Sequence, residues 1–172
     1  MKPWVIPFLQ SRPDDRISLE EFVREVSVPS FAFRRLAGYF NVNFSDNVRL
    51  TELFGGVLAD LPEGVFFQLL GIRNLFFSFN DGLAFMQAMS LEGLPKVAIL
   101  CSLSSELITL SDPRVRGAIA HELSHICLGH YQEDAQRGVR AGRENQTDQK
   151  AIEWGFEYEI SAVREYLKSC AR

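Results

Sequence analysis

One short stretch constrains the fold more than any other part of the chain. Residues 121–125 read His-Glu-Leu-Ser-His. On an α-helix, His121 and His125 are one turn apart, about 6 Å along the axis and about 40° around it, so both imidazoles lie on one face and can bind one metal ion. Glu122 lies to the side of that face, where its carboxylate can reach a water molecule at the metal rather than the metal itself. The stretch therefore predicts a helix that carries a metal site.

The residues at both ends of this stretch favour a helix over 111–130. Ser111 or Asp112 can cap its N-terminus, Pro113 suits the first helical position, and Gly129 suits its C-terminal end. Most of the other side chains are apolar, which is typical of a buried helix. Histidine and glutamate inside such a helix are unfavourable unless a metal ion or hydrogen bonds satisfy them. The apolar surroundings therefore argue against a chance match.

Catalytic zinc usually has three protein ligands and a fourth position left for water, so a third ligand is needed. His130 lies nine residues after His121, which on a continuous helix turns it to the opposite side, and we expect it to cap the helix end. Glu144 and Asp148 are spaced i,i+4 on a helix predicted over about 143–168, and so share one face. We expect Glu144 to bind the metal and Asp148 to accept the free N–H of a ligating histidine. Three other acidic residues remain alternatives for the third ligand: Glu133, Asp134 and Glu153.

The rest of the chain reads as helices followed by strands. Residues 1–17, which contain three prolines, are expected to be irregular. Apolar spacing and capping residues predict helices over about 18–26, 31–40, 45–60 and 62–70. Strands are predicted over 74–79 and 96–101, and residues 83–89 fit either a strand or a helix. The expected division is a helical N-terminal region, 1–61, followed by a domain over 62–172 that carries the metal site.

Composition excludes some classes of partner. A net charge of −4 gives no reason to expect nucleic acid or an anionic membrane as a partner. The longest apolar run, 65–79, is interrupted by polar residues, so no membrane span is predicted. The start of the chain does not have the pattern of a signal peptide. The cysteines are odd in number and are expected to be free thiols, which favours a reducing, cytoplasmic location; they are Cys101, Cys127 and Cys170.

The two motifs, in this order and at this separation, resemble the gluzincin metallopeptidases, and in particular the CaaX-prenyl-endopeptidase and heat-shock-protein-X family with its soluble minigluzincin relatives. The matching stretch runs over about 80–156 and includes Ile119-Ala-His-Glu-Leu-Ser-His125 and Arg143-Glu144-x-x-x-Asp148. The resemblance implies an α+β, zincin-like fold, in which a small mixed sheet packs its edge strand on the active-site helix and on a glutamate helix. Residues 1–60 match nothing in that family, and its larger members' membrane helices are absent here.

The resemblance also implies roles for individual residues. One Zn²⁺ per chain would be held by His121, His125 and Glu144, with Glu122 as the general base and Asp148 as the buffering acid. The strand over 97–101 would be the edge strand that pairs with a bound peptide or protein substrate. Its residues are Val97, Ala98, Ile99 and Leu100.

The resulting expectation is a soluble zinc metallopeptidase that hydrolyses peptide bonds. Two other interpretations stay open. One is a peptidase-like regulator that binds or cleaves a single protein partner, as the small immunity and stress regulators of phage and bacteria do. The other is a structural zinc site without chemistry, closed by Cys127 or Cys101. A histidine, tyrosine or arginine that stabilises the oxyanion in such enzymes has no clear counterpart in the sequence.

Overall fold

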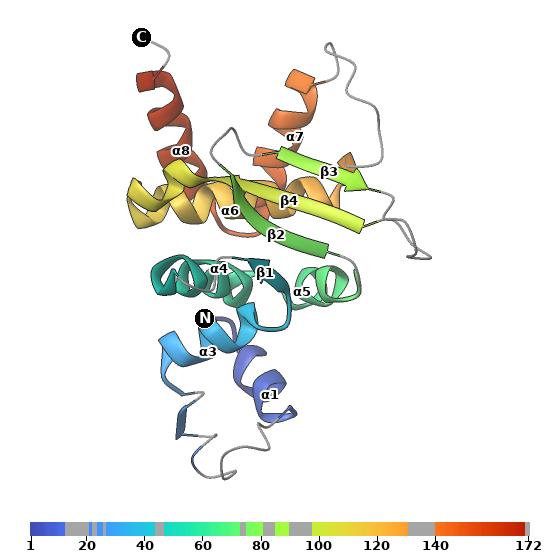
Figure 1. The fold of residues 1–172 in the computed structure, drawn as a ribbon, viewed down its shortest axis with the longest axis vertical. Coiled ribbons are helices and arrows are strands. Elements are labelled where there is room, and N and C mark those ends of the chain that lie inside the picture. The colour runs from blue at the N-terminus through green and yellow to red at the C-terminus, as the bar shows by residue number, and fades with distance from the viewer. Residues whose placement is uncertain are drawn as a thin grey trace.

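The computed structural model describes residues 1–12, 21, 24–25, 27–43, 47–72, 75–80, 85–89, 98–130 and 140–170. Helices and one sheet make up these segments, so the predicted α+β class is confirmed (Figure 1). In Figure 1 the sheet and the helices of the second half lie together, and the helices of the N-terminal region lie below them. No helix in the described segments combines the length and the apolar character that crossing a bilayer requires.

The sheet is small and mixed. Its strands are β1 (Asn41–Asn43), β2 (Leu75–Asn80), β3 (Phe85–Met89) and β4 (Ala98–Ser104), arranged in the order β1-β2-β4-β3. β2 is parallel to both β1 and β4, whereas β3 runs antiparallel to β4. The stretch 83–89, which fits a strand or a helix by its sequence, therefore contributes a strand.

The prediction that residues 97–101 form the edge strand is wrong. Ala98, Ile99 and Leu100 belong to β4, which is paired with β2 on one side and with β3 on the other; Val97 lies outside the described residues. The physical reason is visible in the composition of the strand: a continuous apolar run is typical of a strand inside a sheet, whereas edge strands usually carry charged residues. The edges of this sheet are β1 and β3.

The N-terminal region contains three described helices, α1 (Val5–Gln10), α3 (Pro29–Ala37) and α4 (Val48–Asp60), and a further helix, α5 (Glu63–Leu70), follows the predicted boundary. α1 corrects the expectation that residues 1–17 are irregular; its Pro7 is tolerated because the first turn of a helix needs no backbone donor there. Asn47 caps α4 by accepting a hydrogen bond from the Leu50 amide at 3.0 Å, where Ser45 was the expected cap. Ser45 and most of the predicted helix over 18–26 lie outside the described residues.

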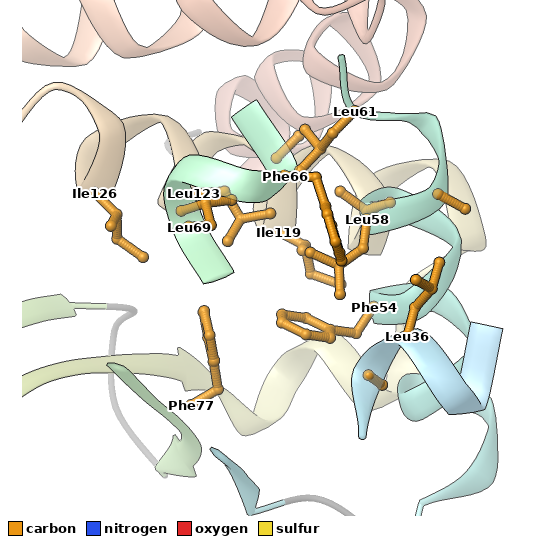
Figure 2. Close-up of a cluster of buried hydrophobic side chains, with 14 of the residues drawn as sticks. Leu36, Phe54, Leu58, Leu61, Phe66, Leu69, Phe77, Ile119, Leu123 and Ile126 are labelled. Atoms are coloured by element: carbon orange, nitrogen blue, oxygen red, sulfur yellow. The ribbon is translucent and has the colours of Figure 1, made fainter. Parts of the chain in front are cut away.

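One buried apolar cluster joins the N-terminal region to α6 (Asp112–Cys127), the helix that carries His121 and His125. Figure 2 shows side chains of α4 and α5, such as Phe54 and Phe66, together with Ile119 and Leu123 of α6 and Phe77 of β2. An ion pair between Arg116 and Asp60, at 2.9 Å, adds a polar contact between α6 and α4. Residues on both sides of the predicted boundary at 61–62 thus contribute to one core.

The C-terminal part holds two helices where the sequence predicts one. α7 (Arg140–Glu153) and α8 (Glu157–Cys170) are separated at Gly155, whose φ of 106° is a conformation that only glycine adopts readily. Trp154 and Phe156, on either side of the glycine, are buried. α8 packs closely on α6 at Gly117, where an added Cβ would lie 2.4 Å from the Glu159 carbonyl oxygen. The break therefore folds α8 back onto α6 and α7.

Candidate metal centre

α6 presents both motif histidines on one face, as their spacing predicts. The Nε2 atoms of His121 and His125 lie 3.1 Å apart, and both side chains are largely buried. Glu122, the next residue along the helix, is buried as well, with 8% of its surface exposed. Apolar residues of α6 that face the core, including Ile119 and Leu123, hold the helix in place against the N-terminal helices.

α7 brings two carboxylates to these histidines. Glu144 places Oε2 at 3.2 Å from His121 Nε2 and Oε1 at 3.7 Å from His125 Nε2. Asp148, one turn later, places Oδ1 at 2.8 Å from His121 Nδ1. Glu144 and Asp148 thus contact the two different ring nitrogens of His121. Glu153 points elsewhere and forms an ion pair with Lys150 at 3.1 Å, whereas Glu133 and Asp134 lie outside the described residues.

His125, the second histidine of the motif, also contacts two further side chains. His125 Nδ1 lies 2.8 Å from His130 Nδ1 and 3.2 Å from the hydroxyl oxygen of Thr147, a fully buried residue of α7. His130 was expected to face away from the site, and this expectation is wrong. It held only for a continuous helix, but α6 ends at Cys127, and Gly129 with φ of 72° turns the chain back towards the site.

The hydrogen-bond partners determine which nitrogens carry lone pairs. Thr147 donates its hydroxyl proton to the Arg143 carbonyl at 2.8 Å, so a hydrogen bond between Thr147 and His125 has His125 Nδ1–H as the donor. His130 Nδ1, at 2.8 Å from the same atom, then acts as a second acceptor of this N–H. Asp148, as a carboxylate, accepts from His121 Nδ1–H. Both Nε2 atoms are then unprotonated in the neutral imidazoles, and they face each other and the Glu144 carboxylate. Lone pairs so arranged repel one another unless a cation lies between them.

The donor set fits a zinc ion. Two imidazole nitrogens and one carboxylate oxygen are ligands that zinc accepts, and at 2.0–2.1 Å from a tetrahedral ion such atoms lie about 3.3 Å apart. The separations here are 3.1, 3.2 and 3.7 Å. The ligand atoms of His121, His125 and Glu144 form the group that can hold a metal ion in the described part of the chain, and no thiol belongs to it. Burial raises the pKa of Cys127 to about 11 and that of Cys101 well above its ordinary value, so both are uncharged thiols at neutral pH in the absence of a metal.

Without a metal, a proton takes the cation's place. Burial alone would lower the pKa of His121, but hydrogen bonds to Asp148 and Glu144 outweigh it and raise this pKa to about 9. Burial and the charge of His121 lower the pKa of His125 to about 4. The hydrogen bond from His121 lowers the pKa of Glu144. At neutral pH in the absence of a metal, the His121 imidazole is therefore protonated and positively charged, whereas His125 is neutral.

This proton makes metal binding depend on pH. Because zinc binds the deprotonated imidazole, binding should release the His121 proton, and the affinity should rise about tenfold per pH unit as the pH increases towards 9. Chelator competition with zinc between pH 6.5 and 8.5 measures this slope, and calorimetry in two buffers of different ionisation enthalpy measures the released proton. An affinity that stays constant over this range would contradict the assignment.

Glu122 differs from the other two acidic residues. Burial raises its pKa to about 7, with the nearby positive charge of His121 acting in the opposite direction. A carboxylate whose pKa lies near neutrality is suited to accept and return a proton at physiological pH. The site thus combines a group for cation binding, made of His121, His125 and Glu144, with one buried carboxyl that can act as a base.

Sequence reasoning missed three residues around the site: His130, Thr147 and Arg164. Arg164, on α8, forms an ion pair and a hydrogen bond with Asp148 Oδ2. Thr147 carries a signal that could have been used, because it lies three residues after Glu144 and therefore on the same face of the helix. Gly155 is the corresponding signal for Arg164, because a glycine at a helix end allows the chain to reverse.

Comparison with family models, curated proteins and solved structures gives no significant match. The link to the gluzincin metallopeptidases therefore consists of the two sequence motifs and remains a resemblance.

Proposed function

We propose that this protein is a zinc-dependent peptidase of the gluzincin type, which holds one zinc ion through His121, His125 and Glu144. The observation that carries the proposal is the convergence of two imidazole nitrogens and a carboxylate within 3.1 to 3.7 Å of one another, beside a buried carboxyl that does not belong to the group. A structural zinc site normally has a fourth protein ligand. Three ligands among the described residues, together with an adjacent base, favour chemistry over a structural role.

The proposed mechanism divides the work among the side chains. A zinc ion held by His121, His125 and Glu144 would act as a Lewis acid, which would make water more acidic and polarise the carbonyl of the scissile bond. Glu122 accepts the proton of the attacking water and passes it to the leaving amine nitrogen. Asp148 holds His121 in the tautomer whose Nε2 can bind the metal, and Thr147 and His130 do the same for His125.

The sheet order supports a proposal for where a substrate would bind. β3 is an edge strand, it packs next to α6, and no other described strand pairs with its outer side. An extended peptide can add to such an edge through main-chain hydrogen bonds, which are independent of the peptide's sequence. We therefore assign substrate pairing to β3 (Phe85–Met89) in place of the strand that the sequence suggested.

Metal analysis tests this proposal most directly. Purified protein should contain about one zinc ion per chain, because the site offers one complete ligand set. His121→Ala and His125→Ala should each lose it, after reconstitution with zinc to exclude loss during purification. The exposed Glu153, also on α7, provides a control in Glu153→Gln, which should keep the metal. Full metal content in both histidine variants would refute the assignment.

An assay on unfolded protein and peptide mixtures then separates the two functional interpretations. Cleavage by the zinc-loaded protein supports a peptidase with broad main-chain recognition. Zinc binding without cleavage of any generic substrate, combined with retention of one partner in pull-downs, would favour the peptidase-like regulator instead.

A further inference from the structure

A chain of polar contacts extends from the candidate metal site to the last helix. Asp148 uses its two carboxylate oxygens in different directions: Oδ1 contacts His121 Nδ1 at 2.8 Å, and Oδ2 receives the guanidinium of Arg164. The Asp148 and Arg164 side chains are each at least partly buried. Asp148 on α7 thus joins a histidine of α6 to an arginine of α8.

We propose that Arg164 is a positioning residue for the metal site, acting through Asp148. This inference rests on the proposed function, since it assigns Arg164 a role in shaping the zinc ligand His121. A carboxylate held at one oxygen can rotate about its side-chain bonds, whereas contacts at both oxygens determine its orientation. The planar guanidinium is suited to this task because its N–H groups project in a rigid fork. Arg164 therefore fixes the orientation of the Asp148 carboxylate, which in turn accepts the Nδ1 proton of His121 and so determines the tautomer of that histidine.

The charge of Arg164 and its positioning of Asp148 are expected to change metal affinity in opposite directions. A positive side chain near a cation site repels the metal, so its removal should strengthen metal binding if charge were the only interaction. Positioning through Asp148 predicts that removal weakens binding, because His121 loses part of its orientation. The sign of the change in affinity therefore distinguishes the two effects, and no measurement of hydrolysis is needed.

The chain offers a matched control. Arg116 of α6 also forms ion pairs, with Asp60 at 2.9 Å and with Glu159 of α8 at 3.2 Å, and neither partner belongs to the site. Arg116→Gln removes the same charge as Arg164→Gln and breaks a contact between α6 and α8, but leaves Asp148 untouched. It therefore reports what the loss of one positive charge and of one interhelical ion pair does by itself.

The experiment measures zinc and cobalt(II) affinity of the whole chain by chelator competition. Arg164→Gln should weaken binding by about tenfold, the lower end of the range for outer partners of metal ligands. Arg164→Lys should recover part of this loss, and Arg116→Gln should lower the Tm without weakening binding. In an Asp148→Asn background, Arg164→Gln should cause no further loss, because the route to His121 is already broken.

Each other outcome overturns the inference. Equal or tighter binding by Arg164→Gln, with a melting transition that shows the variant is folded, would mean that Arg164 has no positioning role. An undiminished loss in the Asp148→Asn background would mean that it does not act through Asp148. Both results would leave the proposed function intact, whereas absence of zinc binding by the unaltered protein would overturn the proposed function and this inference together.

Discussion

Glu122→Gln is expected to abolish peptide hydrolysis while the metal stays bound. The amide has the size of the carboxyl group but cannot accept the proton of the attacking water, and loss of a general base typically lowers the rate by about 10²–10⁴-fold. Metal binding should persist because Glu122 does not belong to the group formed by His121, His125 and Glu144. Zinc content and peptidase rates of the same preparation measure both effects.

The same substitution should make the metal-free protein more stable. Burial raises the Glu122 pKa from its ordinary value of 4.5 to about 7, so above pH 7 folding carries the full penalty of a buried carboxylate. The difference between these pKa values corresponds to about 3 kcal/mol, which is the upper limit of the expected gain at pH 8. Below pH 4.5 the carboxyl is protonated in both the folded and the unfolded chain, so the gain should vanish. Urea unfolding at the two pH values measures it.

Glu153→Gln is the control for this prediction. Glu153 is exposed and pairs with Lys150 on the surface of α7, so its replacement should change neither hydrolysis nor stability by a measurable amount. If Glu122→Gln lost the metal, Glu122 would be a ligand and the assignment of the base would be wrong. Unchanged hydrolysis with full zinc would place the base elsewhere.

Glu144→Ala and Asp148→Asn should differ in their effects on metal binding. Glu144 contacts both Nε2 atoms and is assigned to the metal, so its removal leaves two ligands and should abolish most of the affinity. Asp148 contacts only Nδ1 of His121, the ring nitrogen that is not assigned to the metal, and its replacement should weaken metal binding by about 10–100-fold. Competition with chelators of graded strength resolves the two values.

Thermal unfolding provides a second measure of this difference. A metal ion that binds only the folded chain raises the Tm in proportion to its binding free energy. Saturating zinc should therefore raise the Tm of the unaltered protein most, that of Asp148→Asn less, and that of Glu144→Ala hardly at all. The control is again on α7, where Glu153→Ala should respond to zinc as the unaltered protein does. Equal losses for Glu144→Ala and Asp148→Asn would remove the distinction on which the resemblance to the gluzincins depends.

The sequence alone determined the parts of the site that lie within single helices. The facing arrangement of His121 and His125, and the shared face of Glu144 and Asp148, follow from the rise and turn of an α-helix, which are the same in every protein. The buried character of α6 could be predicted for the same reason, because apolar side chains around the whole helix leave no face for water. Such features need only neighbours along the chain.

The tertiary structure decided how these elements meet. Residues 97–101 were recognised as a strand, but their place inside the sheet depends on pairing with β2 and β3, which no local pattern encodes. The contact between Arg164 and Asp148 exists because Gly155 ends α7 and α8 folds back over it. His130 reaches His125 because Gly129 ends the preceding helix. The physical reason is common to all three: such contacts depend on where the chain reverses and on the sum of many weak packing interactions between distant residues, and neither is contained in the periodicity of a single segment.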